Sequence, residues 1–472
     1  MLALTAMLAG CGGGSSGSGG ASSSAPTGTS PATPTPTASG CSLLDRQNWA
    51  FAQLKEWYLF PDTLPASLDP APYSTVDAYV SALTATARQQ HKDRNFTYLT
   101  SIKGEDAYYA SGSSAGYGIR LTLDASNRLF VTEAFEGASA LDAGVDRGAQ
   151  IVAIGTSAST LQTVSAIITS GGADALTTAL GPDTSGTTRV FQISDASGTR
   201  NVTLTKTDFS LTPVSSRYGA QVITDNGQKF GYINLRTFIS TANDALRNAF
   251  ATFKAAGVNN IVVDLRYNGG GLVSVAETMA NLMGGNRSSS DVIDRMVFRP
   301  EKSSENTTAT FAVQPQSVSP TRLAFIGTGG TASASEIVIN AFVPYLHANA
   351  ALIGTNTYGK PVGQIALDRK ACDDRLRVIA FAVQNAAGTG DYYDGLATKV
   401  EASCQAGDDL SHPLGSPLES STRSALDFLE GKSCSRIAGT TGDASALSVS
   451  SKRTLLTPNR PSTAQREVPG LF

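Results

Sequence analysis

The stretch Gly330-Thr331-Ala332-Ser333-Ala334-Ser335-Glu336-Ile337 lies where a predicted strand ending near Ile326 gives way to a predicted helix. Only small residues flank Ser333, so its hydroxyl group is unhindered. A serine at such a junction lies at a helix N-terminus, where unpaired N–H groups and the positive end of the helix dipole can stabilise an oxyanion. The stretch therefore predicts a nucleophilic serine on a strand–helix unit.

The same residues also fit a capping box, in which the Ser333 hydroxyl and the Glu336 carboxylate satisfy free N–H groups of the first helical turn. A second glycine-rich strand end favours the nucleophile. It reads Asp264-Leu265-Arg266-Tyr267-Asn268-Gly269-Gly270-Gly271, and it can supply backbone N–H donors to the same site.

A serine nucleophile needs a basic neighbour, because its hydroxyl is weakly reactive until another group takes the proton. Lys360 lies in Tyr358-Gly359-Lys360-Pro361-Val362-Gly363-Gln364, one strand–loop unit after the serine. A lysine can act as a base only when burial or a nearby dipole lowers its pKa from about 10.4. The alternatives are that Lys360 is a solvated loop lysine, or that His412, in a polar turn, is the base.

Together these three motifs resemble those of the carboxyl-terminal-processing, or tail-specific, serine peptidases, and the likeness runs from about residue 43 to about residue 432. The resemblance implies that Ser333 is the nucleophile, Lys360 the general base and Gln364 the residue that orients the lysine. It also implies an oxyanion hole formed by the N–H groups of Gly270 and Ala334. The family usually reads Asn-Pro-Gly-Gly where this chain has Asn268-Gly269-Gly270-Gly271, so the glycine that donates is left open.

Residues 114–207 read as strands and turns around one short helix, after a helical segment at 41–113. The loop Gly116-Tyr117-Gly118-Ile119 resembles the carboxylate-binding loop of a PDZ domain, and a pattern resembling the PDZ helix–turn–strand follows at 137–155. This resemblance implies that a peptide adds to a sheet edge and that its free carboxylate is held at Tyr117, Gly118 and Ile119.

Strands and helices alternate from residue 215 to residue 434, which indicates an α/β domain, and the family implies a crotonase-like core. The predicted fold class is therefore α/β: a crotonase-like peptidase core with an N-terminal helical segment and an inserted mainly-β PDZ domain. Residues 435–472 are rich in Ser, Thr, Ala and Pro and predict a mobile tail.

The N-terminus reads as an export signal. Residues 1–10 are mostly apolar and predict a signal peptide, and Leu8-Ala9-Gly10-Cys11 resembles a bacterial lipobox in which Cys11 is lipidated. Residues 11–40 are almost wholly Gly, Ser, Thr, Ala and Pro and predict a flexible tether. Residue 12 is glycine and not aspartate, which favours the outer membrane of the cell envelope. The alternative is a disordered leader with a chance cysteine.

Four cysteines remain after Cys11, an even number that fits an oxidising compartment and allows three pairings. Pairing of Cys41 with Cys434 would tie the ends of the folded part, and pairing of Cys372 with Cys404 would close the late strands. Four free thiols are the alternative.

Composition limits the function further. Charged residues make up 16% of the chain, and the net charge of -3 gives no basic excess for nucleic acid. No run of eighteen apolar residues occurs, and Cys and His never cluster with metal-ligand spacing, so neither a metal nor another cofactor is predicted. We expect a serine endopeptidase that cleaves exported proteins or peptides near their free C-termini. The alternatives are a non-catalytic ligand- or peptide-binding protein on the same scaffold, and a PDZ scaffold with a structural core.

Overall fold

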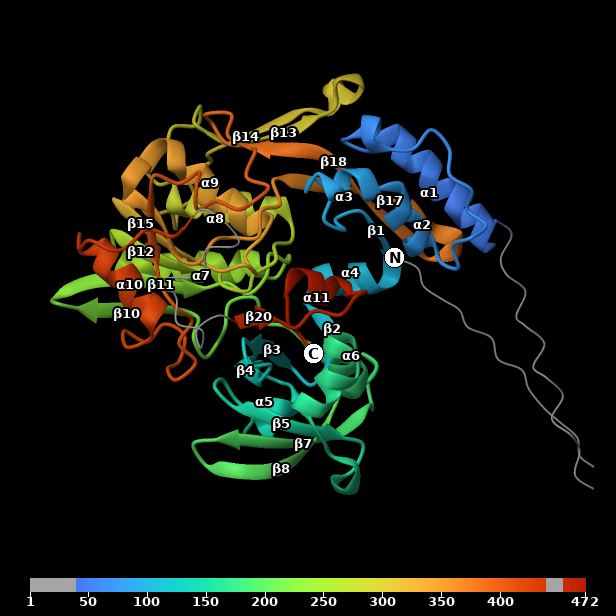
Figure 1. Ribbon diagram of the computed structural model, residues 1–472. Coiled ribbons are helices and arrows are strands. Elements are labelled where there is room, and N and C mark those ends of the chain that lie inside the picture. Colours follow the sequence, from blue (N-terminus) through green and yellow to red (C-terminus); the bar gives the residue numbers. More distant parts are fainter. Residues whose placement is uncertain (1–39, 439–452) are drawn as a thin grey trace, which may run out of the picture.

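The computed structural model describes residues 40–438 and 453–472. The predicted signal peptide, Cys11 and nearly all of the tether lie outside the described residues, as do residues 439–452 of the predicted tail. Figure 1 shows three parts: a mixed sheet flanked by helices, a smaller sheet with the N-terminal helices on it, and a β-rich domain that holds the C-terminal end. No helix of the described residues is long and apolar enough to cross a bilayer.

The first part is a six-stranded sheet in the order β10-β11-β12-β15-β16-β19. All neighbours are parallel except β10 and β11. Its strands are β10 (Ala220–Asp225), β11 (Gln228–Asn234), β12 (Asn260–Asp264), β15 (Arg322–Gly327), β16 (Ala350–Gly354) and β19 (Ala402–Gln405). Parallel strands joined through helices confirm the α/β prediction for this region.

Alternating side chains on these strands bury both faces of the sheet, as expected for a parallel sheet between helices. Ile261 and Val263 point to the face covered by α7 (Ala242–Ala255), α8 (Val273–Met283) and α9 (Ala334–Leu346). Val262 points to the opposite face, where α10 (Ser420–Leu429) contributes Leu426. The sheet is thus held from both sides, which fixes the loops at the carboxyl ends of β12 and β15.

The second part is a five-stranded sheet in which β18 (Asp374–Gln384) pairs with β1 (Tyr98–Ser101), β13 (Val292–Phe298) and β17 (Val362–Arg369), and β14 (Thr307–Thr310) pairs with β13. Three helices pack on this sheet: α1 (Leu43–Trp57), α2 (Val76–Leu83) and α3 (Ala85–Gln89). Leu54 of α1 and Val80 of α2 share one apolar cluster with Leu376 of β18. These three helices lie in the segment 41–113 that the sequence predicts to be helical, and Thr84 separates α2 from α3.

The third part, the β-rich domain, contains a seven-stranded sheet in the order β20-β3-β4-β5-β7-β8, with β6 (Gln162–Thr163) paired to β5. Its strands are β3 (Ile119–Asp124), β4 (Leu129–Ala134), β5 (Gln150–Gly155), β7 (Thr188–Asp195), β8 (Gly198–Thr205) and β20 (Arg453–Leu455). Two helices cover it, α5 (Ser139–Asp142) and α6 (Val164–Leu180). The ribbon of β2 (Ser113–Gly116) and β9 (Thr207–Ser210) joins this domain to α4 (Ile102–Ser111) and to the rest of the chain.

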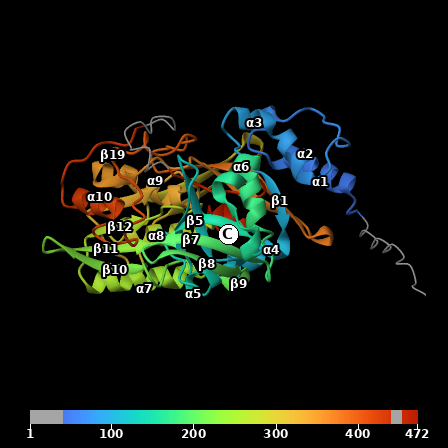
Figure 2. The ribbon, with the colours of Figure 1, turned by 60° about the horizontal axis from the view of Figure 1, so that its bottom comes forward.

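The prediction of a mobile tail is wrong for residues 453–472. This segment forms β20 and α11 (Thr463–Glu467), and Phe472 is only 3% exposed. Figures 1 and 2 both place the C-terminal end in the β-rich domain near α6. Composition misled the prediction, because Ser, Thr and Pro are common in tails, whereas the apolar residues Leu456, Val468 and Leu471 are few but all buried.

Neither of the two disulfide pairings considered from the sequence, Cys41 with Cys434 or Cys372 with Cys404, occurs in the structure. Cys41 pairs with Cys372, which joins the start of α1 to the five-stranded sheet, and Cys404 pairs with Cys434, which closes the segment around α10. Sequence alone cannot choose among three pairings, because pairing depends on which Cα atoms the fold brings within about 4.4–6.8 Å. The Cα atoms lie 5.6 Å apart in the first pair and 5.4 Å apart in the second.

Candidate active site

Ser333 occupies a strained turn between β15 and α9. Its backbone has φ 56° and ψ -117°, a region that residues with side chains rarely adopt and that costs about 1–3 kcal/mol. The turn is fastened to the loop after β12, because Ala332 N–H donates to Asn268 O (3.0 Å) and the Ser335 hydroxyl donates to the same oxygen (3.0 Å). Two loops from neighbouring parallel strands therefore hold the serine at the helix N-terminus, as the sequence predicts.

Gly270 lies directly beside Ser333. A Cβ atom added at Gly270 would lie 2.8 Å from Ser333 Cβ and 3.1 Å from Ala334 N, and its φ of 122° also requires glycine. The structure thus brings Gly270 and Ala334 together beside Ser333, as the sequence predicts. The Gly270 N–H, however, donates to Asn268 Oδ1 (2.9 Å). Ala334 N–H has no partner among the described residues, so it is the open donor next to Ser333.

Glu336 ties the serine loop to the lysine loop. Its Oε2 accepts hydrogen bonds from Ser333 N–H (3.0 Å) and Lys360 N–H (2.8 Å). Its Oε1 accepts from Gly359 N–H (2.8 Å) and the Thr357 hydroxyl (2.6 Å). Burial raises the pKa of Glu336, while these four donors oppose that rise by favouring the carboxylate. The capping glutamate of the sequence thus has a second role that its spacing did not reveal.

Lys360 and Gln364 meet as predicted. Lys360 Nζ donates to Gln364 Oε1 (2.9 Å), and Gln364 Nε2 donates to the carbonyl of Phe96, which fixes the amide orientation. Phe96 also places its ring 5.2 Å from Nζ. Burial lowers the pKa of Lys360, while the negative charge of Glu467 raises it. The lysine forms no salt bridge within the described residues. The negative charge of Glu467 therefore opposes the effect of burial on the pKa of Lys360 only from a distance.

No hydrogen bond joins Ser333 Oγ to Lys360 Nζ, although both residues are described. Catalytic hydrogen bonds are often long in a protein without substrate and tighten when it binds, so their absence here does not exclude either residue. Beside the two loops lies a cavity of about 780 Å³. Its lining includes Lys360, Ala332, Gly269, Phe96 and Tyr358, and it also includes residues of the segment 453–472.

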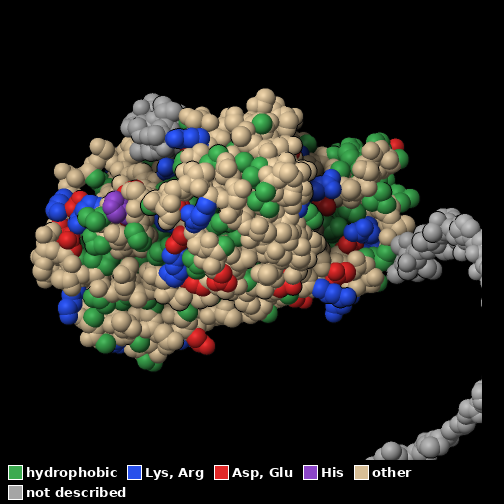
Figure 3. All heavy atoms as spheres, turned by 90° about the horizontal axis from the view of Figure 1, so that it is seen from below, with side chains coloured by type: hydrophobic (Ala, Val, Ile, Leu, Met, Phe, Trp, Pro, Cys, Tyr) green, Lys and Arg blue, Asp and Glu red, His purple; other side chains and the backbone are tan. Residues whose placement is uncertain are grey.

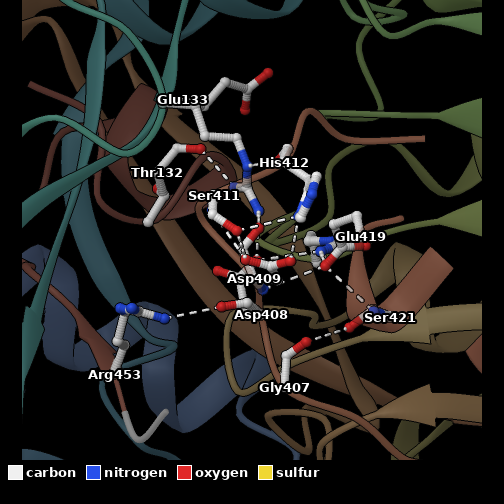
Figure 4. A network of polar contacts seen from close by, with 12 residues as sticks. Thr132, Glu133, Gly407, Asp408, Asp409, Ser411, His412, Glu419, Ser421 and Arg453 are labelled. Atoms are coloured by element: carbon white, nitrogen blue, oxygen red, sulfur yellow. Dashed lines mark hydrogen bonds and ion pairs between the residues drawn. The ribbon is translucent and has the colours of Figure 1, made fainter. Parts of the chain in front are cut away.

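His412 lies in a different environment. Figure 4 shows it turned toward Asp409, whose Oδ2 lies 2.6 Å from His412 Nδ1. The neighbouring Asp408 accepts from Arg147 (2.7 Å) of the β-rich domain and from Arg266 (3.1 Å). His412 therefore sits beside a polar network that joins the β-rich domain to the α/β part, and no hydrogen bond connects it to Ser333.

The residues predicted to hold a peptide carboxylate lie at the start of β3, where they are packed against or hydrogen-bonded to other parts of the same chain. Tyr117 is fully buried and donates to Leu180 O (2.9 Å). Gly118 has φ 72° and lies so close to Ala138 that an added Cβ would come within 2.0 Å of the alanine Cβ. Ile119 N–H donates to Phe472 O (3.1 Å) of the same chain.

Three residues of the site were not assigned roles from the sequence. Asn268 was visible in the glycine-rich motif, and its polar side chain before three glycines was the available signal. Phe96 and Glu467 gave no such signal, because they come from distant segments and contribute through a carbonyl group and a charge.

The surface seen in Figure 3 carries acidic and basic side chains scattered over it, without a large patch of either sign.

Comparison with known proteins finds a family match for the region that contains the site. Residues 229–389 match peptidase family S41. The chain is 33% identical over 166 residues to the chloroplastic carboxyl-terminal-processing peptidase 2 of Arabidopsis thaliana, which covers 34% of this chain and 30% of that protein. It is 26% identical over 254 residues to the carboxyl-terminal-processing protease of Synechocystis, and this alignment covers 53% of this chain and 54% of that protein. The chain thus spans about a third to a half of the length of these relatives.

A solved structure of a protein assigned to the S41 proteases, from Bacteroides fragilis, has the same fold. Its TM-score is 0.61 at 24% identity, and the alignment covers 81% of this chain and 97% of that chain. The region matched by sequence contains the glycine-rich loop, Ser333, Lys360 and Gln364. The resemblance drawn from the three motifs is therefore confirmed for the part of the chain that carries them: residues 229–389 match peptidase family S41.

Proposed function

We propose that this chain is a serine endopeptidase that works by acyl transfer with a Ser333–Lys360 dyad. One observation carries the proposal: a single buried carboxylate oxygen of Glu336 accepts the backbone N–H groups of both Ser333 and Lys360. Such a bridge fixes the position of the serine loop relative to the lysine loop, as a nucleophile and its base require. A glutamate that served only as a helix cap would not also accept hydrogen bonds from the lysine loop.

In the proposed reaction, neutral Lys360 takes the proton of Ser333 Oγ as that oxygen attacks the substrate carbonyl carbon. The negative charge on the carbonyl oxygen is stabilised by Ala334 N–H at the start of α9 and by a donor of the glycine loop. Collapse breaks the C–N bond, and Lys360 returns its proton to the leaving amine. A water molecule then hydrolyses the acyl-enzyme by the same steps. Gln364 keeps the lysine nitrogen oriented throughout.

We propose protein or peptide chains with free C-termini as substrates. This part of the proposal rests on the resemblance of the loop at Tyr117, Gly118 and Ile119 to a PDZ carboxylate loop and of the α/β part to a crotonase-like core. Substrate capture there and cleavage at Ser333 would be separate events. Amidation of a substrate C-terminus should then raise KM several-fold and change kcat less, as loss of uniform binding does.

We also propose that the protein is exported and anchored to the outer membrane through Cys11. The support is the lipobox-like Leu8-Ala9-Gly10-Cys11 and the tether after it. The presence of two disulfide pairs in the folded part fits an oxidising compartment. Replacement Cys11→Ser should release the protein into the soluble fraction, and an unmodified cysteine at the mature N-terminus would contradict the anchor.

The second candidate function is a non-catalytic peptide-binding protein, which the missing hydrogen bond between Ser333 and Lys360 favours. Reaction with a fluorophosphonate separates the two. An endopeptidase should gain the mass of one phosphonyl group on Ser333, and Lys360→Ala should slow this gain by orders of magnitude. The exposed lysine variant Lys370→Ala is the matched control and should react normally. Absence of labelling in a folded protein would favour the binding function.

A further inference from the structure

The segment 453–472 occupies the whole free edge of β3. Residues Arg453–Leu455 pair antiparallel with Asp124–Thr122, and Leu456 N–H donates to Leu121 O (3.0 Å). The segment then leaves the edge and returns to it. Leu121 N–H donates to Gly470 O (2.8 Å), and Ile119 and Phe472 exchange two backbone hydrogen bonds (3.1 and 2.8 Å). Strand addition of this kind is the means by which sheet edges bind extended peptides.

Side chains of the same segment fill the apolar space beside that edge. Phe472 is 3% exposed and belongs to the cluster that contains Ile119, Leu176 and Leu180, so it lies between β3 and α6. Figure 2 shows α6 close to the C-terminal end. A large aromatic side chain buried between a sheet edge and a helix is a specific anchor, because it fills a pocket of matching size.

Between its two contacts with β3, the segment crosses the candidate active site. Gly269 N–H donates to Glu467 O (2.8 Å), and Arg466 lies 3.6 Å from the ring centroid of Tyr98. The Glu467 carboxylate accepts from the Tyr109 hydroxyl (2.9 Å), and its charge acts on Lys360. Residues 465–467 and Pro469 form part of the wall of the cavity that Lys360 also lines.

The contact at Gly269 depends on that residue being glycine. A Cβ atom there would lie 2.2 Å from Arg466 O and 3.1 Å from Glu467 O. These are backbone oxygens, so they can move away only if the segment moves. The glycine-rich loop therefore holds a peptide carbonyl of residues 453–472 one residue away from Gly270, the neighbour of Ser333.

From these contacts we propose that residues 453–472 are an intramolecular peptide ligand, which occupies the edge of β3 and part of the cavity that Lys360 lines. A peptide that binds in its place needs an extended backbone, a carbonyl group for Gly269 N–H and an aromatic side chain at the position of Phe472. The proposal rests on the proposed function in one respect only: the displaced segment makes way for a substrate. The binding site itself does not require that Ser333 reacts.

The test uses a fluorescent synthetic peptide with the sequence of residues 462–472 and measures its binding by anisotropy. The protein carries Ser333→Ala throughout, so that cleavage cannot consume the probe. Phe472→Ala removes the anchor of the internal segment, and Gly269→Ala pushes the segment from the loop. The control is Arg460→Ala, an exposed residue of the same segment.

We expect Phe472→Ala to bind the peptide at least tenfold more tightly than the Ser333→Ala parent, because the internal competitor is weakened. Arg460→Ala should match the parent. A probe with alanine in place of its phenylalanine should bind at least tenfold more weakly to the Phe472→Ala protein. Gly269→Ala should make residues 453–472 more accessible to limited proteolysis.

Equal binding by the parent and by Phe472→Ala, with both folded by circular dichroism, would overturn the proposal and make the segment a permanent part of the sheet. Fluorophosphonate labelling of the protein with Ser333 intact reports on the proposed function separately. Labelling of Ser333 without any change in peptide binding would refute only the proposal that residues 453–472 are an internal ligand. Changed peptide binding without labelling would refute only the proposed peptidase function.

Discussion

Replacement of Glu336 by glutamine tests the bridge between the loop of Ser333 and the loop of Lys360. Each carboxylate oxygen accepts two hydrogen bonds, and an amide nitrogen at either position would face donors instead. At Oε1 the Gly359 N–H would lose its acceptor, although the Thr357 hydroxyl can turn. At Oε2 the N–H groups of Ser333 and Lys360 would both lose theirs. In either orientation at least one buried N–H is left without a partner.

One unsatisfied buried donor costs about 1–3 kcal/mol, so Glu336→Gln should lower the free energy of unfolding by about that amount. If the same loss appears in the transition state, kcat/KM should fall by roughly 5- to 150-fold, since about 1.36 kcal/mol corresponds to a factor of ten. The fall should lie mainly in kcat, because the bridge positions the reacting groups and does not touch the bound chain.

Urea unfolding and steady-state kinetics on a peptide substrate measure both effects. The control is Glu301→Gln, the same chemical change at a side chain that is 67% exposed, and it should leave both quantities unchanged. If Glu336→Gln kept the stability and the kcat of the parent, the idea that this carboxylate holds the serine and lysine loops together would be refuted.

Three further predictions concern the dyad and one buried acid. Ser333→Ala and Lys360→Ala should each remove nearly all hydrolysis, and the double variant should be little worse, because groups that act as a unit are not additive; wild-type turnover in Lys360→Ala would show that the lysine is not the base. Burial lowers the pKa of Lys360 below 10.5, and only the neutral amine accepts a proton, so kcat should rise with pH through one ionisation below that value; a histidine-like profile that disappears in His412→Ala would favour the other base. Burial raises the pKa of Asp294 from 3.8 to about 7, and neither of its carboxyl oxygens has a partner among the described residues. The folded state therefore holds this proton more tightly than the unfolded state, and stability falls as pH rises from about 4 to about 7, by up to about 4 kcal/mol at about 1.36 kcal/mol per unit. Asp294→Asn should remove that fall in pH-dependent urea unfolding, and an unchanged pH dependence would show that the carboxyl ionises freely.

The sequence by itself predicted the α/β alternation and the meeting of three motifs. These features are local or periodic. Parallel strands bring their carboxyl ends to one edge, so Ser333 after β15 and the glycine loop after β12 had to lie near each other. The pairing of Gln364 with Lys360 was implied by the family resemblance, and in the structure Lys360 Nζ donates a hydrogen bond to Gln364 Oε1.

Tertiary structure decided what depended on residues far apart in the chain. The disulfide pairs, the second role of Glu336 and the carbonyl of Phe96 on Gln364 follow from distances that no spacing in the sequence encodes. The segment 453–472 is the clearest case. Its composition resembles a tail, yet a few apolar side chains and one free strand edge are enough to order it across the site. Burial and edge pairing are properties of the folded surface, and only the folded chain presents that surface.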